Sequence, residues 1–164
     1  MLKSSPPDKA AVSRSWNIAA GASGDQLLGR WDTPIGVPGT TGVLQRGENI
    51  IFTVWMRKSS TVATMFPRVV LTQNAYAHNT ERVLGLCEAT GTSELTRTWT
   101  AYTLTCTTTL TVTFTSADRF TLDAHVLITN RGTGQVSVLI GLEGTTDGTY
   151  DSRVQTPNPG ALRA

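Results

Sequence analysis

Residues 109–130 read TLTVTFTSADRFTLDAHVLITN, and apolar side chains occupy alternate positions through most of this stretch. One apolar series alternates with threonines at its start, and a second series runs from Phe120 to Ile128. Successive side chains of a β-strand point to opposite faces, so this pattern predicts two strands, each with one apolar and one polar row. A third alternating segment, Val136–Leu142, follows an Asn/Gly-rich turn at residues 130–134. Together the three segments predict one wall of a sandwich.

The rest of the chain continues the same pattern, with strand-like segments separated by turn-forming residues and no segment of helical periodicity. We expect an all-β fold, an antiparallel β-sandwich or jelly roll of about 8–10 strands, with extended N- and C-terminal arms. The domain is expected at residues 11–156, between an arm at 1–10 and a tail at 157–164. The other predicted strands lie at residues 12–20, 26–31, 50–57, 66–71, 82–87, 99–106 (with a β-bulge where its apolar phase shifts) and 150–156, and the predicted loops include 33–42 and 72–80.

The composition restricts the function classes. Only 16% of the 164 residues are charged, below the roughly 25% of ordinary soluble chains. The formal net charge is +2, and no run of Lys and Arg with interleaved aromatics occurs, so no nucleic-acid partner is expected. No apolar stretch is long enough to cross a bilayer, and the first residues lack a secretory h-region, so no membrane partner is expected.

Candidate chemistry is sparse. Cys87 and Cys106 fall in strand-like segments, where two buried thiols are the default; a disulfide would need their strands to be neighbours, which the sequence leaves open. His78 is predicted in a loop and His125 on the polar row of a strand, both facing solvent, and no zinc spacing or catalytic triad is present. Residues 147–151 are interpreted as a β-turn and not as a calcium loop. We therefore predict no metal, no cofactor, no catalytic residue and no enzyme activity.

Four segments carry a resemblance: WTAYT (99–103), ADRF (117–120), GLEG (141–144) and the closing YDSRVQTP (150–157). They resemble a jelly-roll module of tailed-phage virion structural proteins of the decoration or cement kind, over the C-terminal third to half of the chain. A weaker resemblance is to carbohydrate-binding β-sandwich modules. Neither implies a catalytic residue. On physical grounds Asp118 is expected to cap backbone amides and Arg119 to pair with a carboxylate across the sheet.

The phage resemblance implies a structural role. The chain would stabilise a phage head by binding neighbouring subunits of the major capsid protein, as a homo-oligomer for which a trimer is the leading expectation. Its location would be the virion surface, after synthesis in the host cytoplasm. Apolar residues on rows that should face water are the interface candidates, namely Ile51, Trp55, Leu127 and Leu139.

The alternative function is a carbohydrate-binding module of an extracellular protein. Exposed aromatic rings can stack on sugar rings, and Trp31 and Tyr76 are the candidates because each adjoins a loop. This alternative predicts a coplanar, exposed pair of aromatic rings in a groove.

Overall fold

The computed structural model describes residues 12–33, 43–77, 80–130, 132–143 and 152–155. These ranges contain strands and turns but no helix, and therefore no helix that could span a membrane. The strands are rich in threonine, valine, isoleucine and aromatic residues, whose branched or bulky side chains pack well on a pleated surface. The eleven strands are β1 (Val12–Ile18), β2 (Gly24–Asp32), β3 (Val43–Leu44), β4 (Asn49–Lys58), β5 (Thr64–Ala77), β6 (Thr80–Thr90), β7 (Thr100–Thr107), β8 (Val112–Thr113), β9 (Asp118–Asn130), β10 (Val136–Glu143) and β11 (Arg153–Gln155).

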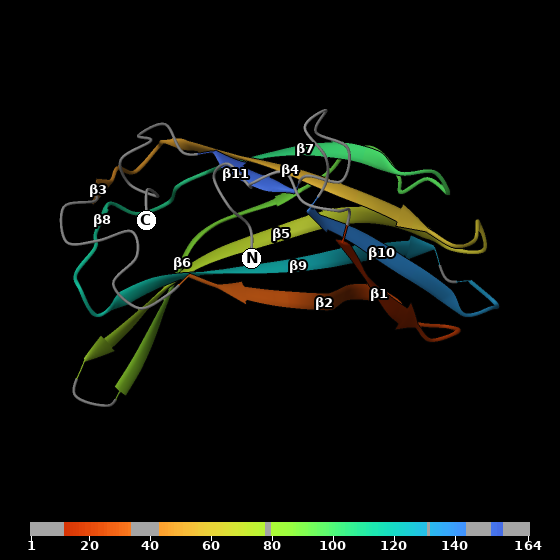
Figure 1. The fold of residues 1–164 in the computed structure, drawn as a ribbon, viewed down its shortest axis with the longest axis horizontal. Helices are drawn as coiled ribbons and strands as arrows, with labels where there is room; N and C mark the ends of the chain where they lie inside the picture. Colours follow the sequence, from red (N-terminus) through yellow and green to blue (C-terminus); the bar gives the residue numbers. More distant parts are fainter. Residues whose placement is uncertain (1–11, 34–42, 78–79, 131, 144–151, 156–164) are drawn as a thin grey trace.

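The strands form two large sheets and one small one (Figure 1). Sheet A contains β1, β10, β4 and β7 in that order, and β11 lies beside β4 where β10 ends. Sheet B has the order β2-β9-β5-β6. The short strands β3 and β8 pair with each other. All described pairings are antiparallel, as predicted.

The strand pairs are nested along the chain. The pair β5·β6 is enclosed by β4·β7, then by β3·β8, β2·β9 and finally β1·β10. The chain is thus one long antiparallel hairpin, and the pairings β4·β10 and β5·β9 roll this hairpin into two sheets. This is the jelly-roll arrangement of two Greek keys, so the predicted fold class is confirmed.

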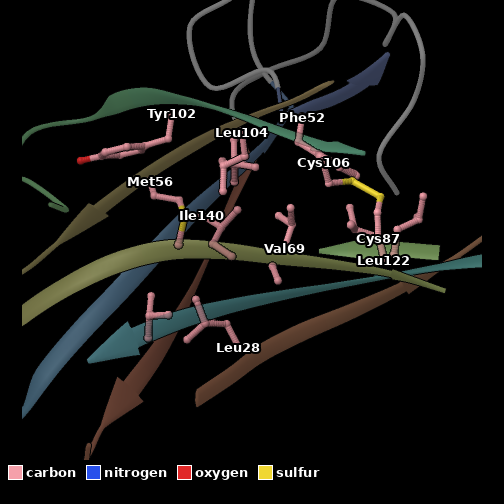
Figure 2. Packing of buried hydrophobic residues seen from close by; sticks show 14 of the residues in the cluster. Leu28, Phe52, Met56, Val69, Cys87, Tyr102, Leu104, Cys106, Leu122 and Ile140 are labelled. Carbon is pink, nitrogen blue, oxygen red and sulfur yellow. A yellow bond between two sulfur atoms is a disulfide. The ribbon is translucent and has the colours of Figure 1, made fainter. Parts of the chain in front are cut away.

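The inward rows of both sheets form one hydrophobic core. On β4 the inward row from Ile50 to Met56 is at most 4% exposed, and on β9 the row from Phe120 to Ile128 is at most 5% exposed. Figure 2 shows residues of sheet A, such as Ile140, above residues of sheet B, such as Val69 and Leu122. Burying each such side chain contributes roughly 1.5–3 kcal/mol, so the alternating rows hold the two sheets together.

A disulfide between Cys87 and Cys106 joins the two sheets (Figure 2). Cys87 belongs to β6 of sheet B and Cys106 to β7 of sheet A, with 5.6 Å between the Cα atoms. Both residues are buried, as expected, but the default of two separate thiols is wrong. Because β6 and β7 are consecutive strands on opposite sheets, the bond ties the two sheets together at this side of the sandwich.

The prediction that β9 and β10 belong to one wall is wrong. They lie in sheet B and sheet A respectively, and their connection crosses between the sheets. The Gly21 N–H donates to the Gly132 carbonyl at 3.1 Å, which places this connection beside the turn between β1 and β2. Alternation identifies the two faces of a strand but does not identify its neighbours, so the assignment to one wall did not follow from it.

Two local predictions near β7 and β8 are also wrong. Only Val112–Thr113 pairs as a strand in the stretch 109–115, although Val112 and Phe114 are buried. The expected bulge in 99–106 is absent, because β7 pairs with β4 in unbroken register and Trp99 lies before the strand. The change of apolar phase therefore marks the beginning of β7.

The predicted loop at residues 72–80 is mostly strand. β5 continues to Ala77, and the hairpin that it forms with β6 extends past the rest of the sandwich (Figure 1). Gln73 and Asn74 are buried in this part of β5, and their amides donate to Asp118 and Thr121 of β9 at 2.9 Å. These partners across the sheet allow polar residues to occupy a central strand.

Candidate functional site

The described outward side chains of sheet A form a surface with little charge, which we call the threonine face. Among these described side chains only Arg57 is charged, and its guanidinium carbon lies 5.3 Å from the centre of the Trp99 ring, a cation–π distance. Charged residues are depleted in the cores of protein interfaces, so this surface has the composition of a contact surface. Its described side chains are Ser13, Ser15 and Asn17 (β1), Ser137 and Leu139 (β10), Asn49, Ile51, Thr53, Trp55 and Arg57 (β4), and Ala101, Thr103, Thr105 and Thr107 (β7).

Three of the four predicted interface residues lie together on the threonine face. Ile51 and Trp55 stand on the same side of β4, and Leu139 lies on the neighbouring strand β10. All three are half-buried within the chain. Trp55 pairs with Gly141 of β10, which has no side chain.

Ser152 stabilises the backbone beneath this surface. Its Oγ accepts a hydrogen bond from the Trp55 N–H at 3.1 Å and donates one to the Gly141 carbonyl at 2.5 Å. Here β10 leaves β4 and β11 takes its place, so the hydroxyl replaces ladder hydrogen bonds at the junction. This tie fixes the backbone that carries Trp55.

The outward side chains of sheet B form a surface of opposite character, which we call the charged face. Asp123 accepts two hydrogen bonds from Arg30 across the β2·β9 pair, each 2.7 Å long. Such two-point bonds between a guanidinium and a carboxylate are strong and directional. The described ionisable side chains of this face are Asp25, Arg30, Asp32, Arg68, Glu88, Arg119, Asp123 and His125. Ion pairs between arginines and carboxylates link most of them across the strands, and His125 lies beside Asp25.

The fourth interface candidate, Leu127, lies on the charged face. It pairs in register with Phe66 of β5, and both side chains are half-buried. This apolar cross-strand pair accounts for Leu127 within the chain itself. The predicted single wall would place Leu127 and Leu139 on one face, but they lie on the outer faces of different sheets.

The described side chains do not provide the expected coplanar pair of exposed aromatic rings for sugar binding. Trp31 lies in β2 and packs edge-on against Trp16, with 6.3 Å between ring centres and 72° between ring planes. Both indoles pack against the core, and they lie so close over Gly29 that a Cβ there would be 2.8 Å from the Trp31 ring. Rings at this angle do not give the coplanar surface expected for stacking on a sugar. Tyr76 belongs to β5 and not to a loop, and its side chain lies outside the described part.

The other candidate residues have structural positions. The His125 side chain is only 15% exposed, with Nδ1 3.1 Å from an Asp25 carboxylate oxygen, so the prediction that it faces solvent is wrong. Asp118 accepts from the Thr115 N–H at 2.7 Å, which confirms its predicted capping role. Arg119 pairs with Asp32 of the neighbouring strand at 3.6 Å, as predicted. His78 and residues 147–151 lie outside the described ranges.

Within the described ranges, no group of three or more His, Cys, Asp or Glu residues is arranged to hold a metal ion. Sequence reasoning missed Lys58, which is buried at the end of β4. Its Nζ donates to the Ala63 carbonyl at 2.8 Å and pairs with Glu94. These contacts tie the loop before β7 to the sandwich, which is a structural role.

The strand order defines the class of this chain as a jelly-roll β-sandwich. No known protein family matches its sequence, and no curated protein matches it. Among solved structures it is similar to Eiger TNF from S. frugiperda, with 14% identity over 86% of this chain and 98% of that chain and a TM-score of 0.24. It is also similar to the D431N mutant VP2 protein of infectious bursal disease virus, in derived T=1 particles, with 13% identity over 97% of this chain and 36% of that chain and a TM-score of 0.25. Likeness at this level carries no argument about function.

Proposed function

We propose that the chain is a non-enzymatic structural protein of a virus particle, a decoration (cement) protein that stabilises a phage head. It binds neighbouring subunits of the major capsid protein through the threonine face, which lies against the shell. The charged face points to solvent. The resemblance of residues 99–157 to phage virion modules motivates the partner, and the two faces of the sandwich supply the physical argument.

The contrast between the two faces carries the proposal. Ion-paired side chains cover sheet B, whereas the described outward side chains of sheet A include one charge, on Arg57. A surface buried on assembly loses its water, and each charge buried without a partner is costly. The threonine face avoids this cost, and Ile51, Trp55 and Leu139 add apolar area to it.

The disulfide supports a location outside a reducing cytosol. Bonds such as Cys87–Cys106 persist in oxidising surroundings and are rare in cytosolic proteins. The surface of a released particle meets this condition, and so does the extracellular alternative.

Homo-oligomerisation is part of the proposal. A light-scattering mass decides between the trimer that the resemblance implies and the dimer argued below from the edge of sheet A. The edge-on arrangement of Trp31 and Trp16 does not favour carbohydrate binding as a second function.

A sedimentation assay tests the function. Purified protein is mixed with phage heads assembled without it, and the heads are pelleted and probed for the bound chain. The wild-type protein is expected to pellet with the heads, and Leu139→Lys to lower this affinity at least about tenfold, since the ammonium would be buried on contact. Leu27→Lys is the matched control, because Leu27 is 54% exposed on the opposite sheet.

Two results would contradict the proposal. Wild-type protein that never pellets with the heads would exclude the decoration function. A Leu139→Lys protein that pellets as well as the wild type would exclude the threonine face as the contact surface.

A further inference from the structure

Each sheet ends in edge strands whose outer sides have no strand partner among the described residues, and proteins usually protect such edges from pairing with other chains. Charged side chains, prolines and β-bulges are the usual protection. The edge strands of sheet B are β2 and β6, and those of sheet A are β1 and β7 together with the three-residue β11. The four longer strands differ in how they are protected.

Three of these edges carry protection. β1 has a register shift at Val12/Ser13 and an exposed arginine at position 14. β2 has a register shift between Leu27 and Gly29 and three charged residues in its sequence. β6 pairs with β5 through a register shift and carries the exposed Glu88. Each shift or charge disfavours the addition of another strand.

β7 has none of these features. Its sequence, TAYTLTCT, contains no charged residue, no proline and no glycine, and it pairs with β4 over eight residues without a register shift. Within the described part of the chain, β4 is its only strand partner. β7 is therefore an uncharged edge with an unbroken register, onto which a further strand can be added.

The outer backbone groups of β7 can be assigned from the ladder. Just past the strand, the Thr108 N–H donates to the Glu48 carbonyl, on the side of β4. Because bonding direction alternates along a strand, the even-numbered residues of β7 bond to β4. The N–H and C=O groups of Ala101, Thr103, Thr105 and Thr107 then point to the open edge.

We propose that β7 pairs with β7 of a second copy of this chain, antiparallel and about a two-fold axis at Leu104. Sheet A then continues through both copies as one sheet. In full register Thr103 lies opposite Thr105 of the second copy, and Ala101 lies opposite Thr107 of the second copy. The outward-pointing groups of these residues form about eight new backbone hydrogen bonds.

A second copy of this chain is a suitable partner for the open edge of β7. An antiparallel pair about a two-fold axis is self-complementary, so one uncharged strand supplies both sides without placing like charges together. Threonine opposite threonine is a favourable cross-strand pair. Pairing at β7 also joins the threonine faces of both copies into one larger surface. This self-association does not depend on binding to a phage head.

Charge exchange at positions 103 and 105 tests the pairing and its register. In Thr103→Lys/Thr105→Lys each lysine faces a lysine of the second copy, whereas in Thr103→Lys/Thr105→Glu each lysine faces a glutamate. Both threonines are exposed on an edge strand, so the fold tolerates these changes. The control is Ser13→Lys/Ser15→Lys, which changes two exposed positions of β1 on the opposite edge of the same sheet.

The measurements are light-scattering mass across a concentration series and amide hydrogen exchange of the full chain, with no phage heads present. We expect the wild type, the control and the Lys/Glu variant to have twice the chain mass of 17.6 kDa. The Lys/Lys variant is expected to have the mass of one chain, with the dissociation constant of the dimer raised at least about tenfold. The Thr103 and Thr105 amides of the wild type should lose protection on dilution.

Any one of three results overturns the proposal: the wild type stays a single chain at every concentration, the wild type is a trimer, or the Lys/Lys variant dimerises as the wild type does. A Lys/Glu variant as monomeric as the Lys/Lys variant overturns the register.

Discussion

Removal of the bond between Cys87 and Cys106 is expected to destabilise the fold by about 3 kcal/mol. The two cysteines are 19 positions apart, and a crosslink closing a loop of this length removes about 3 kcal/mol of entropy from the unfolded chain. For a chain of this size, such a loss lowers the melting temperature by roughly 6–12 °C. Reduction of the wild type isolates this contribution because it leaves both sulfur atoms in the core.

The assay compares thermal and urea unfolding of wild type and Cys87→Ala/Cys106→Ala, each with and without a thiol reductant. The reductant should destabilise the wild type and leave the double variant unchanged. The double variant should be at least as unstable as the reduced wild type, because both sulfur positions are buried and their removal leaves small cavities. Two reactive thiols in the denatured, unreduced protein, or a wild-type midpoint that does not respond to reductant, would refute the reasoning.

Three further predictions use the same unfolding assays. Gly29→Ala should destabilise the fold by about 1–3 kcal/mol, because the added methyl group would meet two tryptophan rings. Gly85→Ala is the control and should be neutral or stabilising, because no atom lies within 4 Å of a Cβ at this position. Equal effects of the two substitutions would contradict the prediction. Asp123→Asn and Arg30→Met should show a coupling of about 1 kcal/mol in a double-mutant cycle, and additive effects would argue against the ion pair. Lys58→Ala should cost about 2–4 kcal/mol, since it removes a buried side chain and its hydrogen bonds, and an unchanged midpoint would exclude that role.

The faces of the long strands could be predicted from the sequence. Period-2 alternation assigned the inward rows of β4, β9 and β10, and these rows are buried. The signal is reliable because a strand with one row in the core must alternate apolar and polar residues. The capping role of Asp118 was predicted because its partner, the Thr115 N–H, is only three positions away. The pairing of Arg119 with a carboxylate across the sheet was predicted as well, but not the identity of its partner, Asp32.

Strand partners could not be predicted in the same way. Gln73 and Asn74 suggested a loop because polar residues are depleted in central strands, yet both are buried against side chains of β9 more than forty positions away. The connection from β9 to β10 contains turn residues that suit a hairpin within one sheet and a crossing between two sheets equally well. Local sequence does not contain the information that decides between them.

The candidate surface was predicted in part for the same reason. Ile51, Trp55 and Leu139 were identified as outward apolar residues, but their proximity depends on the pairing of β4 with β10. The open edge of β7 was missed altogether. Its uncharged sequence was visible, yet only the sheet order shows that β7 lies at an edge.

The nested order of the strands has a consequence for synthesis. Asn17 and Ser137 are hydrogen-bonded neighbours in the finished fold, although 120 positions separate them. A ribosome must therefore complete β10 before β1 acquires its partner, and pairings between distant segments form slowly. β1 and β2 emerge early and wait with unpaired edges while the central hairpin β5·β6 forms. The nascent polypeptide consequently exposes apolar surface and unpaired strand edges during translation, and slower elongation would prolong this exposure.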